Sequence, residues 1–328
     1  MLKRLLQRSR LRRFWILFVS SIIVTCIVAL SLVTDQQQTL AQTGGSCQIP
    51  PNAIAQKEQL RLAALKGDPA AQQQYQALAR QHGQQVQACR QQQWPRKQAI
   101  WLRLYPCDVR PGELNRIFDQ IVNTGYNQVY VEMFYDGRVL LPAANNPTVW
   151  PSVVSQPGLE NVDLLEQALQ VGRQRGLDVY AWLFTLNFGY TYSLRPDRQT
   201  AIALNGSGQT SLDVVPDSTP VFVDPYSPEA RRDYLQLIRE VQRYNPDGVL
   251  FDYVRFPRGR GTASIVSRVQ DLFIHNAAAR NAFLDRAQNA KGRALLQQFI
   301  TKGFVGSYDI ATVNNQYPGD PVPLWENS

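Results

Sequence analysis

The segment Asp247–Pro257, DGVLFDYVRFP, carries three chemically active side chains directly after a short apolar run. The apolar run Val249–Phe251 follows an Asp-Gly turn signal and predicts a strand buried on both faces of a parallel sheet. Asp252, Tyr253 and Arg255 then supply a carboxylate, a phenol and a guanidinium. Because α/β barrels hold their chemistry at the carboxyl ends of such strands, these side chains are candidate functional residues. The alternative is a structural ion pair between Asp252 and Arg255.

Other predicted strands end in side chains of the same kinds. The expected substrate-binding residues are Arg103, Asp136, Trp182, Asn187, Tyr253 and Arg255. Carboxylates beside aromatic rings and polar donors are typical of a sugar site, and a glycosidase needs a pair of carboxylates at the scissile bond. We predict Asp252 as the nucleophile or stabilising carboxylate, and Glu132 as a weaker catalytic candidate. Glu132 is equally well explained as an ion-pair partner, and Trp182 as either a stacking platform or barrel core.

Strands alternate with helices between residues 99 and 257. The predicted strands are Ala99–Tyr105, Asn127–Met133, Leu177–Thr185 and the strand at Val249–Phe251, and the predicted helices are Pro111–Asn123, Val162–Arg175 and Pro228–Tyr244. This alternation indicates parallel βαβ units, and long polar loops at the strand carboxyl ends indicate a (β/α)8 barrel of the TIM type. The predicted fold class is therefore α/β, with the first four βα units of such a barrel.

After residue 257 the pattern becomes helical. Helices are expected over Ile265–Ile274, Ala277–Ala287 and Lys291–Lys302, followed by a loop at Gly303–Ser328. Nothing in this region predicts strands five to eight. Four strands leave a sheet open at both edges, so a homodimer that completes the barrel and a truncated, inactive barrel are both retained as alternatives.

Positive charge is concentrated at the start of the chain. Residues 1–13 hold six lysines or arginines, and without them the formal net charge falls from +8 to +2. The near-neutral body has no nucleic-acid motif, so no nucleic-acid partner is expected. Residues 14–33 contain no charged side chain and are long enough to cross a bilayer as a helix.

The positive-inside rule then predicts a cytoplasmic tail, a membrane anchor and a periplasmic or other extracytoplasmic body. The alternative is a signal peptide whose removal secretes the protein, since Thr39-Leu40-Ala41 resembles a cleavage site. In order, the expected parts are the tail 1–13, the anchor 14–33, a linker 34–51, a helical hairpin 52–93 and a barrel-like domain 98–328, with its strands before 257 and a helical excursion and tail at 258–328.

The hairpin is built from two predicted helices, Asn52–Lys66 and Ala70–Gln92, and its default interpretation is a spacer or a lid. Cys47 and Cys89 return to the same height of the antiparallel hairpin, so a disulfide is expected in an oxidising compartment; the alternative is two unpaired thiols. His82 is expected on a solvated face. The spacing of cysteine and histidine suggests no metal site, and no cofactor is predicted.

Residues 98–257 resemble the glycosyl-hydrolase-like family 10, bacterial (β/α)8 enzymes of the cell envelope, and most closely its cyanobacterial branch. The resembling segments are AIWLRLYP, NQVYVEMFYDGRVLLP, RGLDVYAWLFTLNFGY and DPYSPEARRDYLQLIREVQRYNPDGVLFDYVRFP. The resemblance implies hydrolysis of β-linked envelope glycans, including peptidoglycan strands, and places Asp252 at the acidic position of the fourth strand. It also implies an acid/base carboxylate on a later strand, which this sequence does not contain.

The predicted function is hydrolysis of glycosidic bonds in a cell-envelope polysaccharide. The predicted partners are therefore that polysaccharide and the membrane. A non-catalytic glycan-binding or structural envelope protein is the alternative, because the second half of the barrel is not predicted in this sequence.

Overall fold

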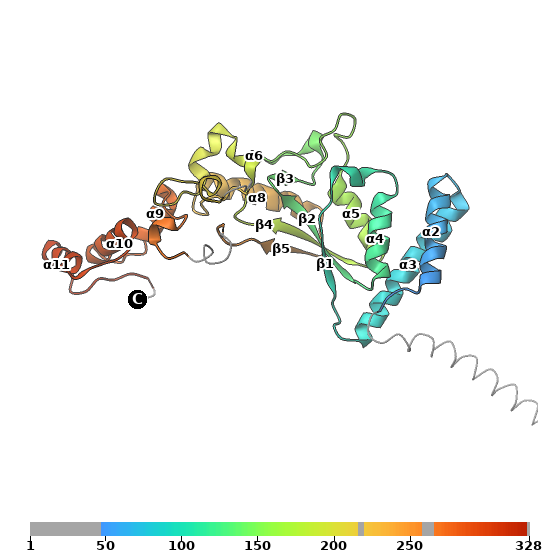
Figure 1. The fold of residues 1–328 in the computed structure, drawn as a ribbon, viewed down its shortest axis with the longest axis horizontal. Helices are drawn as coiled ribbons and strands as arrows, with labels where there is room; N and C mark the ends of the chain where they lie inside the picture. Colours follow the sequence, from blue (N-terminus) through green and yellow to red (C-terminus); the bar gives the residue numbers. More distant parts are fainter. Residues whose placement is uncertain (1–46, 216–219, 258–265, 327–328) are drawn as a thin grey trace, which may run out of the picture. The chain divides into compact units, whose positions relative to one another are not determined.

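Four parallel strands form the centre of the protein in the computed structural model, which describes residues 47–215, 220–257 and 266–326 (Figure 1). The sheet order is β1-β2-β4-β5, and each strand is parallel to its neighbour. The bounds are Ala99–Leu102 for β1, Gln128–Tyr135 for β2, Asp178–Phe184 for β4 and Gly248–Asp252 for β5. The four predicted strands and the parallel α/β fold are thus confirmed.

The helices between successive strands cover one face of this sheet. They are α4, Glu113–Asn123, α5, Leu164–Gln174, and α8, Pro228–Arg243. Because strands adjacent in the sheet follow one another along the chain, right-handed crossovers place each connecting helix on the same side. Figure 1 shows α4 and α5 beside the sheet, and Val131 and Phe118 are fully buried in the core there. Sequential strand order with helices on one face is the arrangement of a barrel.

The last strand is less buried than the sequence indicates. β5 is half-buried along most of its length, and Phe251 is 47% exposed. The expectation of a strand buried on both faces is wrong because, among the described residues, β5 pairs with β4 alone and no strand lies on its other side. The apolar run Val249–Phe251 matches a strand interior to a sheet, yet here it forms an edge.

A short strand that the sequence did not predict, β3 at Arg138–Val139, pairs antiparallel with the end of β2. Asp136 and Gly137 form the two-residue loop between them, and their φ angles are 47° and 70°. Positive φ at both positions defines a type I′ turn, for which Asp-Gly is a preferred sequence. The turn signal is therefore readable, but a two-residue strand has no periodicity to detect.

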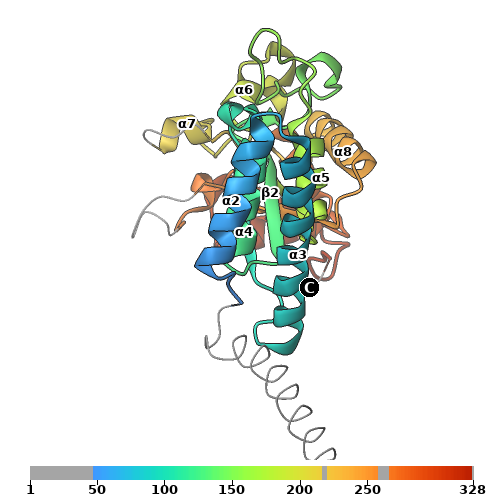
Figure 2. The same ribbon diagram turned by 90° about the vertical axis from the view of Figure 1, so that its right-hand side faces the viewer.

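The helical hairpin forms an outer layer over α4 and α5 (Figure 2). Its helices are α2, Pro51–Leu65, and α3, Pro69–Gln92. Asp119 of α4 accepts hydrogen bonds from the Tyr75 hydroxyl at 2.7 Å and from Arg175 Nε at 2.9 Å, and Lys57 Nζ lies 3.4 Å away. All four side chains are buried, so compensated charges fix the hairpin to the helical layer. The interpretation as a spacer or lid is wrong for this reason.

The buried stripe of α3 includes His82. Its side chain is 2% exposed, and its Nδ1 has no hydrogen-bond partner among the described residues. The expected solvated position is wrong, because residues spaced three and four apart on α3 face α4 and α5 whatever the polarity of their sequence neighbours. Burial of the imidazole lowers the pKa of His82 from 6.5 to about 4.

Several N-terminal expectations fall outside the described residues. The predicted anchor at 14–33 and Cys26 lie there. Cys47 and Cys89 are both disulfide-bonded, and Cys107 is a free, exposed cysteine. Within the part of the chain that the structure describes, no helix combines the length and apolar character needed to span a membrane.

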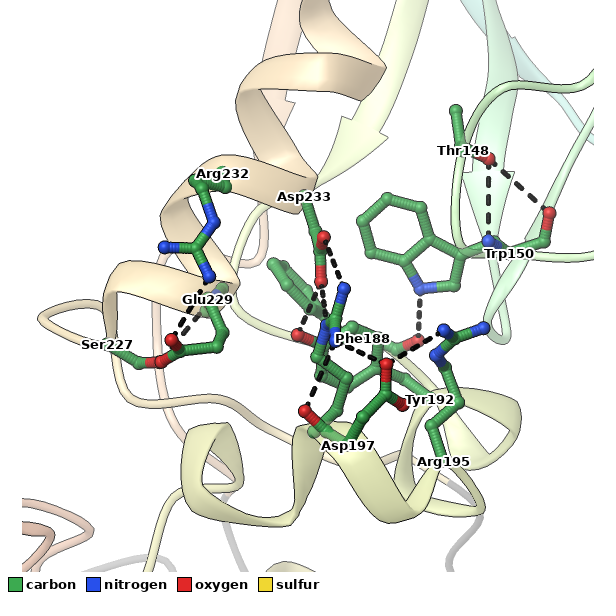
Figure 3. A network of polar contacts seen from close by, with 12 residues as sticks. Thr148, Trp150, Phe188, Tyr192, Arg195, Asp197, Ser227, Glu229, Arg232 and Asp233 are labelled. Atoms are coloured by element: carbon green, nitrogen blue, oxygen red, sulfur yellow. Dashed lines mark hydrogen bonds and ion pairs between the residues drawn. The ribbon is translucent and has the colours of Figure 1, made fainter.

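A polar network folds the long connection from β4 back onto α8 (Figure 3). The connection contains α6, Tyr190–Ser193, η3, Pro196–Ala201, and α7, Ser211–Val214. Asp233 of α8 accepts from the Tyr192 hydroxyl at 2.9 Å and from Arg198 Nε at 2.6 Å. The Trp150 indole donates to the Phe188 carbonyl at 3.1 Å, which joins the loop after β3 to the same region. These contacts hold the loops at the carboxyl ends of β2 and β4.

Within the described residues 266–326, the helices after β5 are α9, Ala277–Leu284, α10, Ala290–Lys302, and α11, Ser307–Gln316, preceded by the turn η5, Val269–Asp271. Two short helices not yet named lie earlier in the chain, η1, Pro106–Val109, and η2, Ala143–Asn145. α9 and α10 agree with the sequence. The helix expected over Ile265–Ile274 is wrong, because one 3-10 turn is formed in its described part.

The loop expected at Gly303–Ser328 is also wrong where α11 forms. Asp309 accepts a hydrogen bond from the Gly306 N–H at 3.0 Å and forms an ion pair with Lys302. The first contact provides a partner for a backbone N–H at the start of α11, a helix whose sequence lacks apolar periodicity. Buried Asp224, which precedes α8, accepts a hydrogen bond from the Ala279 N–H of α9 at 2.9 Å. This contact links the helical segment after β5 to the loop before α8.

Candidate active site at the carboxyl ends of the strands

The candidate side chains form a row on the face of the sheet opposite the helices. Arg103 follows the last residue of β1, and the strand register pairs Glu132 with Trp182 and Phe184 with Asp252. Paired residues of parallel strands point to the same face, and residues two apart on one strand do so as well. Arg103, Glu132, Trp182 and Asp252 therefore line up from β1 to β5 near the strand carboxyl ends.

Glu132 is the buried centre of an ion pair. Its side chain is 1% exposed, and it accepts from both Arg103 Nε and Arg103 Nη2, the latter at 3.0 Å from Oε1. Burial raises the pKa of Glu132, and the Arg103 guanidinium opposes that rise. The hydrogen bond to Glu132 in turn raises the pKa of Arg103. The bidentate geometry matches the ion-pair alternative for Glu132.

Two further groups contact the Arg103 side chain. Arg103 Nη1 lies 3.8 Å from Asp136 Oδ2, and the guanidinium carbon lies 4.6 Å from the centre of the Tyr135 ring. The Tyr135 hydroxyl donates to the Leu104 carbonyl at 2.6 Å, which fixes the ring below the guanidinium. Asp136 sits in the exposed β2–β3 turn, so it borders the row from the solvent side.

Asp252 is held by donors from two neighbouring groups. Trp182 Nε1 donates to Asp252 Oδ2 at 3.1 Å, and the Tyr253 backbone N–H donates to Oδ1 at 2.6 Å. Tyr253 has a φ of 52°, a left-handed conformation that is unfavourable for a bulky residue. An outlier of this kind at the end of a strand is typical of a functional site.

Arg255 does not pair with Asp252 among the described contacts. Its guanidinium carbon lies 4.8 Å from the centre of the Tyr253 ring, and its Nη1 donates to the Phe256 carbonyl at 3.4 Å. The expected ion pair between Asp252 and Arg255 is therefore wrong, because the guanidinium of Arg255 lies over the Tyr253 ring instead. Arg255 remains beside the row as an exposed cation.

Asn187 lies apart from the row in the described contacts. It is buried in the connection after β4, where its Oδ1 accepts from the Gly189 N–H at 3.1 Å and its backbone bridges to Phe222. These contacts shape the loop rather than the carboxylates. The sequence places Asn187 close to the strand end but cannot tell that its amide turns into the loop.

The aromatic layer below the row was not identified from the sequence. Trp101 and Tyr130 stack with ring centres 6.1 Å apart, and Tyr130 lies 5.3 Å from Tyr180. The register pairs Tyr180 with Gly248, and a Cβ at Gly248 would lie 2.6 Å from Cδ1 of the Tyr180 ring. The alternation of aromatic and polar residues along each strand was a usable signal, since Trp101 precedes Arg103 by two and Tyr180 precedes Trp182 by two.

The row combines a buried carboxyl group with a hydrogen-bonded carboxylate on the same face. A buried carboxyl with a raised pKa suits proton donation, and a carboxylate held by N–H donors suits the stabilisation of developing positive charge. Among the residues that the structure describes, no cluster of three or more His, Cys, Asp or Glu is arranged to hold a metal ion.

The solved structures that resemble parts of this chain include the following two. A hypothetical protein from Ruminiclostridium thermocellum ATCC 27405 is 15% identical with a TM-score of 0.36, and the match covers 51% of this chain and 84% of that one. A noncanonic maltogenic alpha-amylase, AmyB from Thermotoga neapolitana, is 11% identical with a TM-score of 0.32, and the match covers 48% of this chain and 39% of the amylase. No curated protein matches.

A family model gives the more specific comparison. Residues 92–285 match the model described as glycosyl hydrolase-like 10. The match includes all strands of the sheet and the whole row from Arg103 to Asp252, and it covers more than half of the sequence. The chain therefore belongs to the glycosyl hydrolase-like 10 family, as its sequence resemblance implies.

Proposed function

We propose that the protein is a glycoside hydrolase that acts on cell-envelope polysaccharide such as the glycan strands of peptidoglycan. Asp252 is the nucleophile or the carboxylate that stabilises the oxocarbenium-like transition state. Glu132 contributes the second carboxyl group, and Trp182, Tyr253, Arg255 and the neighbouring polar groups contact the sugar.

The observation that carries this proposal is the hydrogen-bonded carboxylate of Asp252 at the end of β5. Two N–H donors orient its oxygens, and the aromatic face of the sheet continues below it. Oriented carboxylates beside aromatic rings are what hydrolysis of a glycosidic bond requires. Membership of the glycosyl hydrolase-like family supports the same reaction class.

The test is hydrolysis of purified peptidoglycan glycan strands by the full chain in a mild detergent, followed through new reducing ends. Asp252→Asn is expected to lower kcat by at least about a thousandfold, because the oriented negative charge is lost. Asp285→Asn is the matched control, since Asp285 forms an exposed ion pair with Arg293 in the helical excursion. Turnover that survives Asp252→Asn would exclude this role for Asp252.

A second candidate is a glycan-binding or structural envelope protein without catalysis. It is favoured by the bidentate contact of Arg103 with Glu132, which occupies the carboxyl group that would transfer a proton. This candidate predicts that glycan strands bind with unchanged affinity to Asp252→Asn and that no reducing ends form with either protein. Calorimetry combined with the hydrolysis assay separates the two candidates.

The proposal includes a membrane anchor at residues 14–33 with the body outside the cytoplasm. The basic residues before this apolar segment support that orientation. Protease added to intact spheroplasts is expected to digest the body and to leave a short membrane-bound fragment. Release of an intact body into the medium would instead indicate a cleaved signal peptide, and full protection from protease would contradict export.

A further inference from the structure

The face of the sheet opposite the helices is covered by aromatic rings that are open to solvent. Trp101 is 62% exposed, although it stacks on Tyr130, and Tyr130 and Tyr180 are each only partly buried. Leu250 of β5 lies on the same face and is also partly buried. A contiguous apolar surface of this kind is typical of a face that another element covers.

Both outer strands of the sheet have an unpaired edge in the part of the chain that the structure describes. β1 pairs with β2, β5 pairs with β4, and neither has a second neighbour. Unpaired edges offer their N–H and C=O groups to another strand. Four parallel strands with helices on one face supply half of an eight-stranded barrel. A second four-stranded parallel sheet would therefore pair with both unpaired edges and cover the aromatic face.

The two edges also differ in charge near their carboxyl ends. Asp252 ends β5 and forms no ion pair among the described residues, since its carboxylate contacts Trp182 and the Tyr253 backbone. Arg103 follows β1; its Nε and Nη2 donate to Glu132, and its Nη1 lies 3.8 Å from Asp136, beyond hydrogen-bond distance. One edge thus carries a carboxylate without a cation, and the other carries the Arg103–Glu132 ion pair, in which the Nη1 donors of the guanidinium make no hydrogen bond among the described residues. Such edges are complementary to each other in two copies of one chain.

We propose that the second sheet is a second copy of this chain and that two copies close into one barrel. A two-fold axis along the barrel axis brings β5 of each copy against β1 of the other. This arrangement keeps all eight strands parallel and leaves no free edge. The aromatic layers of the two copies then meet inside the barrel, where Trp101 loses its contact with water.

The closed barrel also completes the candidate site, and this part of the inference rests on the proposed function. In one copy Asp252 lies on an edge strand, with Trp182 on one side and no strand on the other among the described residues. In the closed barrel the other side of Asp252 is occupied by the second copy's Arg103 and Glu132. The second carboxylate that a glycosidase requires is then available on both sides of Asp252.

The test is the mass of the full chain in a density-matched mild detergent, measured by sedimentation equilibrium without glycan. The wild type is expected at twice the chain mass of 37.2 kDa. Trp101→Glu would bury an unpaired carboxylate in the closed barrel, so it is expected to raise the dimer dissociation constant at least about a hundredfold. Tyr308→Glu is the matched control, because Tyr308 is an 80% exposed aromatic residue on α11.

Each outcome decides the proposal. A wild-type dimer that dissociates on Trp101→Glu and persists in Tyr308→Glu supports it. A monomer at ~10 μM, or a dimer that Trp101→Glu leaves intact, overturns it, as does closure of the face by bound polysaccharide or by a different chain. Trp101→Ala is the second variant, with a smaller expected effect of about tenfold, and circular dichroism checks that both variants remain folded. The measurement of mass does not depend on hydrolysis. A dimer without hydrolase activity would therefore contradict only the proposed function, and an active monomer would contradict only the proposed dimer.

Discussion

The indole N–H of Trp182 donates a hydrogen bond to Oδ2 of Asp252 at 3.1 Å, across the neighbouring strands β4 and β5. This contact gives Trp182 an orienting role that neither a stacking platform nor barrel core includes. The donor lies on a strand, and its ring packs against Phe184 with centres 5.7 Å apart. A rigid side chain therefore orients the carboxylate on which the proposed chemistry depends.

Trp182→Phe is expected to lower kcat for glycan hydrolysis by about ten- to a hundredfold with little change in KM. Phenylalanine keeps an aromatic ring but removes the donor, and a hydrogen bond to a charged acceptor contributes about 1.5–3 kcal/mol. Steady-state kinetics on glycan strands provide the measurement. Trp94→Phe, at an 89% exposed ring far from the row in sequence, is the control and should leave both constants unchanged. An equal rise in KM with constant kcat would show that Trp182 only binds substrate.

Arg103→Met is expected to destabilise the protein by about 3 kcal/mol at pH 7. The substitution leaves the fully buried carboxylate of Glu132 without its bidentate partner, and an unpaired buried charge is costly. Chemical unfolding measures the loss. The double variant Arg103→Met/Glu132→Gln is expected to recover at least half of it, because the uncompensated charge is removed together with the cation.

The same pair has a pH dependence that distinguishes charge from packing. Burial raises the pKa of Glu132, and in Arg103→Met the opposing guanidinium is absent. A carboxyl group with a raised folded-state pKa binds protons more tightly in the folded protein, so its stabilising contribution is present at low pH and lost as pH rises through that pKa. The stability deficit of Arg103→Met should therefore shrink between pH 7 and pH 5. A deficit that is constant over this range would mean that lost packing explains it.

Gly248→Ala is expected to lower the free energy of unfolding by about 1–3 kcal/mol. The new Cβ would collide with the ring of Tyr180, which is held in turn against Tyr130, so the aromatic layer must shift. Thermal unfolding followed by circular dichroism measures the effect. Gly319→Ala is the control, since a Cβ there meets open space. Equal stability of the two variants would show that the layer is loosely packed.

The sequence predicts the sheet well because each strand is a local pattern. Ala99–Leu102 and Asp178–Phe184 are short apolar or aromatic runs between helices, and such runs can be detected without any long-range information. The chemistry-bearing residue Asp252 follows from its position at the end of one run. These features depend on a few consecutive residues.

The contacts within the site could not be predicted in the same way. Trp182 and Asp252 are seventy positions apart, and their hydrogen bond depends on the register between β4 and β5. Arg103 and Glu132 meet for the same reason, so the choice between a catalytic residue and an ion-pair partner was left open by the sequence. The exposure of Phe251 depends on a neighbouring strand, which no local pattern can report.

His82 provides the prediction that is most independent of the proposed function. Its imidazole is buried between α3 and the α4–α5 layer, and burial together with the nearby charge of Lys57 lowers its pKa to about 4. The unfolded chain binds the proton with an ordinary pKa of 6.5. Between these two values the unfolded state holds more protons than the folded state, so stability falls as the pH is lowered from about 6.5 to about 4.

We expect this one group to remove about 2 kcal/mol of stability between pH 7 and pH 4, after allowance for solvent screening. His82→Leu should flatten that part of the stability profile, because leucine fills a similar volume and takes up no proton. Urea unfolding at half-unit pH steps measures both profiles. His275→Asn is the control, since His275 lies outside the hairpin, next to the Val269 carbonyl, and its replacement should keep the His82-dependent slope. If His82→Leu retains the wild-type slope, protonation of His82 is not the cause of the acid sensitivity.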